Sequence, residues 1–218
     1  MGGLFSADGK LAQVLGKAAD LVILNVLWIV CSIPVVTAGA AATAFYTVAL
    51  KMIKNEESYV FRSFFQAFKE NFKQATVVTL ILLAVAAVLG CDFYVCTKMG
   101  LEKARPLFIL FCVVAVFVYM GSCYMFPVMA FFENSTKKVF KNSFLMALAH
   151  LPFTILIAVI SLLPWVFLFF GQFIAAAFFD LIAGFSIAGY INAHIFRRIF
   201  KRYIPELWIW KNNRMNQT

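Results

Sequence analysis

The sequence predicts an all-α, polytopic membrane protein: a helix bundle of about five transmembrane spans. Hydrophobic residues make up 63% of the 218, and charged residues only 13%, against about 25% in a soluble domain. The charged residues are gathered between apolar runs longer than about 18 residues, the length that can cross a bilayer. We therefore expect residues 1–218 to form one integral membrane domain with no separate soluble domain.

The first two elements are expected on either side of Pro34. A span over residues 18–36 should end or kink at this proline, which lacks the N–H that a helix interior needs. Residues 38–53 are mostly Ala, Gly and Thr, and small residues four apart let a second helix approach closely. A helix of this length reaches about 24 Å. We expect it to be re-entrant or interfacial, with a sixth full span as the alternative.

Four further spans are expected at residues 74–95, 106–132, 145–170 and 173–196. Amphipathic helices near 58–73 and 134–144 should lie on the cytoplasmic membrane surface. Phenylalanines recur at three- and four-residue steps in the first of them, which predicts an aromatic face that contacts the membrane surface or docks a partner. The members of this candidate docking face are Phe64, Phe65, Phe68 and Phe72.

The basic residues predict the orientation. Fourteen of the 19 Lys and Arg residues lie in the segments 51–73, 137–141 and 197–214. Because basic loops are retained in the cytoplasm, we expect these segments and the tail 197–218 to be cytoplasmic. The net charge of +9 then belongs to the flanks of spans and does not indicate nucleic-acid binding. The N-terminus lies outside with five spans and inside with six.

Two stretches, 18–96 and 106–170, show a faint internal repeat. Ile33-Pro34-Val35 matches Phe126-Pro127-Val128, and a Phe-Lys pattern at 68–75 matches one at 140–147. Each unit would contain a span, a surface helix and a returning span, so both would have the same orientation, as in parallel transporter repeats. The alternative is a chance match between apolar segments.

A dense group of residues in the first third of the chain resembles a known family. These residues are Asp20-Leu21, Asn25-Val26-Leu27-Trp28, Cys31-Ser32-Ile33-Pro34-Val35-Val36-Thr37-Ala38-Gly39-Ala40, Ala44-Phe45-Tyr46, Arg62-Ser63-Phe64-Phe65 and Phe68-Lys69-Glu70-Asn71-Phe72-Lys73-Gln74-Ala75-Thr76. The pattern, dense over residues 18–77, is similar to the YesL family of uncharacterised bacterial membrane proteins. The resemblance implies a plasma-membrane protein often encoded beside carbohydrate importers and polysaccharide-degrading enzymes. It implies no catalytic residues.

Polar residues inside the predicted spans are the candidates for a site, because they are costly in hydrocarbon and face protein or a cavity. They are Asn25, His150, Thr154, Ser161, Asp180 and Asn192. In one interpretation a neutral Asp180 donates a hydrogen bond to Asn25, or to a backbone carbonyl freed near Pro34, and joins the first and fifth spans. In the other, Asp180 has a functional role. Trp165, Trp208 and Trp210 are interpreted as interface anchors rather than sugar-stacking platforms.

The motifs of common enzyme classes are missing from the sequence. It has no phosphate loop, nucleophile elbow or zinc-ligand spacing, so we expect no enzymatic activity, cofactor or metal. Two function classes remain. One is a membrane component linked to carbohydrate uptake, an accessory or partner subunit of a sugar importer; the alternative is a membrane scaffold or signalling adaptor. The expected partners are the lipid bilayer, importer subunits and a second copy of the chain.

Overall fold

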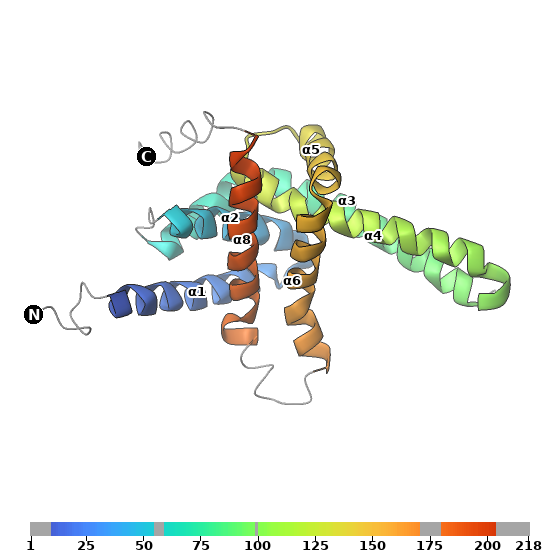
Figure 1. Cartoon of the computed structure of the whole chain (residues 1–218), viewed down its shortest axis with the longest axis horizontal. Coiled ribbons are helices and arrows are strands. Elements are labelled where there is room, and N and C mark those ends of the chain that lie inside the picture. Colours follow the sequence, from blue (N-terminus) through green and yellow to red (C-terminus); the bar gives the residue numbers. More distant parts are fainter. Residues whose placement is uncertain (1–9, 55–58, 99, 171–179, 204–218) are drawn as a thin grey trace, which may run out of the picture.

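The computed structural model describes residues 10–54, 59–98, 100–170 and 180–203, and these form helices and no strand. Figure 1 shows their arrangement. The helices are α1 (Lys10–Ser32), α2 (Ala38–Lys54), α3 (Val60–Lys98), α4 (Leu101–Phe131), α5 (Thr136–Ala149), α6 (Leu151–Phe170) and α8 (Phe185–Lys201). A 3-10 turn (Val35–Thr37) precedes α2, and a π-helical turn (Asp180–Gly184) precedes α8.

Among the described residues, five helical segments are long and apolar enough to cross a membrane, by length and composition: α1, α2 with its 3-10 turn, α3, α4 and α6. The predicted all-α, multi-pass membrane fold is therefore confirmed. The predicted span at 173–196 is described only from residue 180 onward, as the π-helical turn and α8, which continues five residues further to Lys201.

The predicted break at Pro34 is confirmed. α1 ends at Ser32, and the 3-10 turn leads straight into α2. The Thr37 hydroxyl lies 2.6 Å from the carbonyl oxygen of Cys31 and 2.8 Å from that of Pro34. The Cys31 carbonyl is one of those that the end of α1 leaves without a helical partner, whereas the Pro34 carbonyl also accepts from the backbone N–H of Thr37.

α2 is the central helix of the bundle. Twelve of its 17 residues are buried, and it contacts α1, α3, α4 and α8. A Cβ added at Gly39 would collide with Thr79 of α3 and Phe126 of α4, so the small residues do permit close approach, as expected. A helix enclosed in this way does not lie at the surface of the bundle, which favours the alternative of a full span over an interfacial helix.

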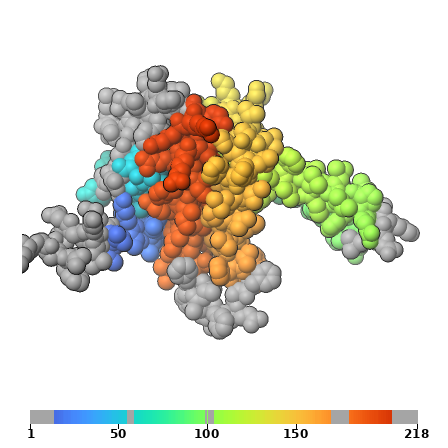
Figure 2. Space-filling view, viewed as in Figure 1, coloured from blue at the N-terminus to red at the C-terminus, as the bar shows by residue number. Residues whose placement is uncertain are grey.

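The predicted surface helix at 58–73 and the span at 74–95 form one helix, α3, of 39 residues. No Gly or Pro interrupts it before Gly90, so the change from amphipathic to apolar sequence does not break the helix. The outer parts of α3 and α4 form a hairpin that projects from the body (Figures 1 and 2). Gly100 lies at its tip with φ of +84°, a conformation that favours glycine.

The predicted fourth span at 145–170 begins too early. Residues 145–149 belong to α5, the helix breaks at His150, and α6 starts at Leu151. Pro152 explains the break, because it has no N–H and fits only the first turn of a new helix. The third span, predicted at 106–132, agrees with α4, although Pro127 lies inside this helix. Since Pro34 ends α1 whereas Pro127 does not end α4, the internal repeat stays a prediction.

The last helix brings the basic segments together. α6 and α8 pack side by side and cross the direction of α1 and the hairpin (Figure 1). At the C-terminal end of α8, Arg197 donates to the carbonyl of Ile53 in α2 over 3.2 Å, and Phe200 packs with Met146 of α5. The segments near 54, 141 and 197 therefore meet around this end of α8, which is what a shared cytoplasmic side requires.

Candidate ligand cavity and its polar contacts

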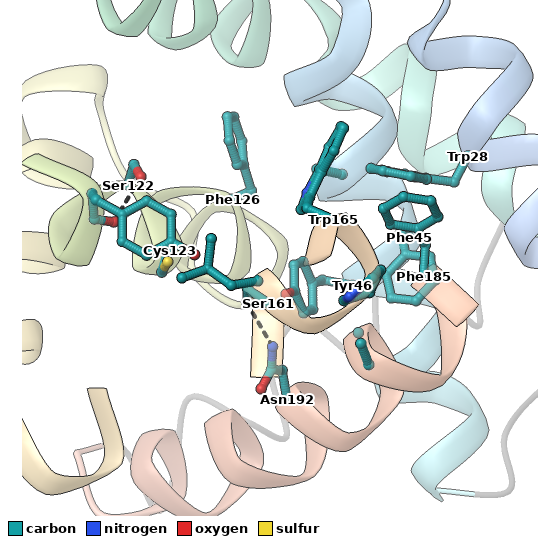
Figure 3. Close-up of a pocket in the computed structure, with 16 residues that line it drawn as sticks. Trp28, Phe45, Tyr46, Ser122, Cys123, Phe126, Ser161, Trp165, Phe185 and Asn192 are labelled. Carbon is teal, nitrogen blue, oxygen red and sulfur yellow. Dashed lines mark hydrogen bonds between the residues drawn. The ribbon is translucent and has the colours of Figure 1, made fainter. Parts of the chain in front are cut away.

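A cavity of about 320 Å³ lies between α1, α2, α4, α6 and α8. Figure 3 shows Trp28, Phe45, Trp165 and Phe185 grouped on one side, with Ser122 and Cys123 on the other. The aromatic wall consists of Trp28, Phe45, Tyr46, Phe126, Trp165 and Phe185. Five helices from both halves of the chain thus line one half-open space.

Phe185 lies between two tryptophans of this wall. Its ring centroid is 5.1 Å from that of Trp28 and 5.3 Å from that of Trp165. Trp165 was expected to be an interface anchor; it is half-exposed, at 47%, and also lines the cavity. Trp208 and Trp210, interpreted in the same way, lie outside the described residues.

Two of the six polar candidates, Ser161 and Asn192, meet at the cavity. The Nδ2 of Asn192 on α8 donates to the Oγ of Ser161 on α6 over 2.9 Å. Asn192 is only 1% exposed, and its Oδ1 has no hydrogen-bond partner among the described residues. Within the described part of the chain, no Asp, Glu, Lys, Arg or His lines the cavity. The lining is therefore aromatic and apolar, with a neutral polar edge.

Asn25 fills the π-helical turn with three hydrogen bonds. Its Nδ2 donates to the carbonyl oxygens of Asp180 (3.3 Å) and Leu181 (2.7 Å), and its Oδ1 accepts from the backbone N–H of Ser186 at 2.9 Å. A π-helical turn shifts the i→i+4 ladder and leaves backbone groups without their usual partners. Asn25, which is fully buried, supplies a donor for two of the carbonyls and an acceptor for one N–H.

The predicted link between the first and last spans is thus present, but its chemistry was predicted wrongly. The Asp180 carboxyl does not bond to Asn25; the amide of Asn25 bonds to the backbone around Asp180. Asp180 is 3% exposed, its Oδ2 has no partner among the described residues, and its Oδ1 packs against Gly184, where an added Cβ would collide with it. Asp180 does not line the cavity.

The other two candidates lie at the α5–α6 break. The hydroxyls of Tyr124 and Thr154 are 2.9 Å apart, and Thr154 Oγ1 lies 2.8 Å from the Ala147 carbonyl, near the end of α5. The Nε2 of His150 lies 2.9 Å from the Tyr203 hydroxyl. These contacts join α4, α5, α6 and the end of α8, outside the cavity.

The four phenylalanines of the candidate docking face do not form one exposed face. Phe64 is fully buried among residues of α2, and Phe65 and Phe68 pack half-buried against the same core. Phe72 alone of the four is exposed, at 37%. The prediction was wrong for Phe64 because the aromatic stripe packs on the end of α2, next to Met52 and Ile53.

The aromatic wall was missed by sequence reasoning. A signal was available for one member: Trp28 lies three residues after Asn25, so both share a face of α1, and an Asn in a span indicates the face that packs on protein. For Phe45 and Phe185 the sequence offers no comparable signal, because the chain has 26 phenylalanines.

Comparisons with known proteins agree with the resemblance in the first third of the chain. The family model described as "Protein of unknown function, DUF624" matches residues 21–93, which cover most of α1, all of α2 and most of α3. The "Uncharacterized protein YesL" of Bacillus subtilis (strain 168) is 31% identical over 142 residues, which are 63% of this chain and 66% of that relative. No solved structure matches.

Proposed function

The chain belongs to the YesL family, and on that premise we propose that it is a bacterial plasma-membrane component linked to carbohydrate uptake, an accessory or partner subunit of a sugar importer. The observation that supports this proposal is the cavity between the helices. Its volume of about 320 Å³ falls at the small end of ligand sites, which span about 300–1,000 Å³. A protein that only holds others in place needs no such space.

The lining of the cavity fits a solute better than a structural void. Engineered apolar voids are lined by aliphatic and aromatic groups alone, whereas this cavity adds an amide and hydroxyls at one edge. Ligand sites typically combine an aromatic wall with a few polar groups. Sugar rings present both an apolar C–H face and hydroxyls, so they match this combination.

The importer would have to contain other subunits. The sequence has no phosphate loop, so the energy of an ATP-driven importer would come from a partner. In the proposed orientation, the basic segments around the end of α8 face the cytoplasm, where such a partner acts.

The direct test is co-purification. The chain, tagged at its C-terminus, would be expressed at native level, extracted in mild detergent and analysed by mass spectrometry, with an unrelated multi-pass protein of similar abundance as the control. We expect importer subunits to be enriched, and deletion of the gene to slow growth on one or more sugars. The proposal would be refuted if importer subunits were not enriched and the deletion strain grew normally on a full panel of sugars.

A second candidate function, a membrane scaffold or adaptor, is favoured by a groove on the α3–α4 hairpin. The groove is lined by Ala84, Val85, Val88, Leu89 and Asp92 of α3 and by Leu110, Phe111 and Val114 of α4. Asp92 is half-exposed in otherwise apolar surroundings. Lipid tails offer a carboxyl no hydrogen bond, whereas a partner helix with a donor does. If this function is correct, Asp92→Leu should abolish co-purification of that partner without affecting sugar-dependent growth.

A further inference from the structure

We propose that the cavity binds one uncharged, hydroxylated ring, whose polar edge meets Asn192 and Ser161 and whose apolar face packs on Trp28, Phe185 and Trp165. The inference deepens the proposed function and rests on it for the choice of a monosaccharide as the ring. The ring class itself follows from three features of the cavity: its charge, its polar edge and its aromatic wall.

The absence of charge from the lining restricts the ligand to neutral molecules. None of the described residues that line the cavity is Asp, Glu, Lys, Arg or His. A charged ligand moved from water into such a space would lose its hydration without gaining a counter-charge, at a cost of several kcal/mol. Uronic acids, sugar phosphates and protonated amino sugars should therefore be rejected, and neutral sugars accepted.

The polar edge has hydrogen-bonding capacity that the protein does not use. With the amide oriented so that Ser161 accepts from Asn192, the Ser161 hydroxyl proton has no acceptor among the described residues. The Asn192 amide has one polar atom with no partner among the described residues, and this holds for either orientation of the amide. A ligand hydroxyl both donates and accepts. It can therefore pair with groups whose burial without a partner is otherwise unfavourable.

The aromatic wall and the volume set the size and shape. Phe185 and the two tryptophans form a continuous apolar surface, with centroids 5.1 and 5.3 Å from the central ring. This surface and the Ser161–Asn192 contact line the same cavity (Figure 3), so one ligand can touch both. A cavity near the lower limit for ligand sites accommodates a single ring rather than an oligosaccharide. A lipid acyl chain would fit the wall but leave the polar edge unpaired.

The test measures binding to the full-length protein purified in detergent, by calorimetry and by the change in tryptophan fluorescence. The probes are glucose, galactose and mannose, each compared with its uronic acid and its 6-phosphate. We expect at least one neutral hexose to bind saturably, and its two anionic forms to bind at least tenfold more weakly. Equal binding of a neutral sugar and its uronic acid would overturn the inference.

Variants locate the site. Asn192→Leu should weaken hexose binding at least tenfold, and the smaller change Ser161→Ala at least threefold; Ser161→Ala remains informative if the Asn192 variant does not fold. The control is Asn71→Leu, because the Asn71 amide bonds only within α3, to the Ala67 carbonyl, away from the cavity. Unchanged binding in Ser161→Ala and in a folded Asn192→Leu would overturn the inference.

If no hexose binds and a lipid co-purifies that Trp165→Ala releases, the cavity binds an acyl chain and the inference is overturned. If no hexose binds and no lipid is found, the ring ligand is refuted as well. Neither result depends on whether importer subunits co-purify. Conversely, a protein that binds a hexose but retains no importer subunit would refute the proposed function and leave the ligand site intact.

Discussion

Replacement of Asn25 by leucine should destabilise the protein more than any other single polar-to-apolar change in α1. The substitution Asn25→Leu would remove all three hydrogen bonds between α1 and the π-helical turn: two to carbonyls and one from the N–H of Ser186. The backbone groups would then be left in apolar surroundings without partners. Leucine has the same number and branching of side-chain heavy atoms, although its methyl groups are larger, so the change removes the hydrogen bonds and also crowds a fully buried position.

The size of the effect follows from the number of contacts. Hydrogen bonds between membrane helices contribute about 0.6 kcal/mol on average and up to about 1.7 kcal/mol, so three of them correspond to roughly 2–5 kcal/mol of unfolding free energy. A change of 1 kcal/mol shifts the melting temperature of a chain of this length by about 2–4 °C. The expected decrease is therefore roughly 4–20 °C.

The assay is thermal unfolding in detergent, followed by the loss of the monodisperse peak in size-exclusion chromatography. Asn71→Leu serves as the matched control, because it makes the same substitution at a residue whose amide bonds only to the Ala67 carbonyl of its own helix, and it should shift the midpoint by less than about 2 °C. If Asn25→Leu melts as late as Asn71→Leu, Asn25 does not hold the π-helical turn and the reasoning is wrong.

Four further outcomes are expected. Gly39→Ala should lower the melting temperature, by the equivalent of about 1–3 kcal/mol, because its Cβ would meet Thr79 and Phe126. The control Gly90→Ala should not, because nothing lies within 4 Å of an added Cβ there. Equal melting temperatures for the two variants would contradict the close packing of α2. Asp180→Ala should leave thermal stability unchanged or higher, since it removes a buried oxygen without a partner among the described residues; lost sugar-dependent growth at unchanged stability would indicate a functional carboxyl instead. Tyr124→Phe should cost about 1 kcal/mol in denaturant unfolding by removing the contact with Thr154, and no change would show that this contact contributes nothing. A reporter that is active only in the cytoplasm should be active when fused after Thr218, and a reporter that is active only outside the cell should be inactive there. The opposite result would contradict a cytoplasmic C-terminus.

Hydropathy and composition were sufficient to predict the fold class, but helix boundaries were predicted only where a residue favours them. Pro34 lacks the N–H that a helix interior needs, and α1 ends two residues before it; Pro127 lacks the same group inside α4, which continues, so a proline favours a boundary without fixing it. The supposed boundary inside α3 had no such residue; a change from polar to apolar surroundings does not interrupt backbone hydrogen bonds. At the α5–α6 break, Pro152 was the available signal.

The candidate site was predictable only in part, because it depends on contacts between distant residues. The cost of an amide in hydrocarbon correctly indicated that Asn25 bonds to another helix, about 155 residues away. Whether it bonds to a side chain or a backbone depends on the π-helical turn, which leaves no periodic pattern in the sequence. The cavity is a property of five helices at once, so the Ser161–Asn192 contact and the aromatic wall became visible only in the structure.

The position of Asn25 couples assembly of the bundle to occupancy of the cavity. Trp28 lies one helical turn beyond Asn25, and Phe185 directly follows the π-helical turn that Asn25 holds. These two neighbouring rings of the aromatic wall are thus both anchored next to the contact between Asn25 and the π-helical turn, which is called the joint below. By thermodynamic linkage, a ligand that binds only when this joint is closed also stabilises the closed joint. Loss of the joint would consequently appear twice, as a lower melting temperature and as a weaker ligand affinity.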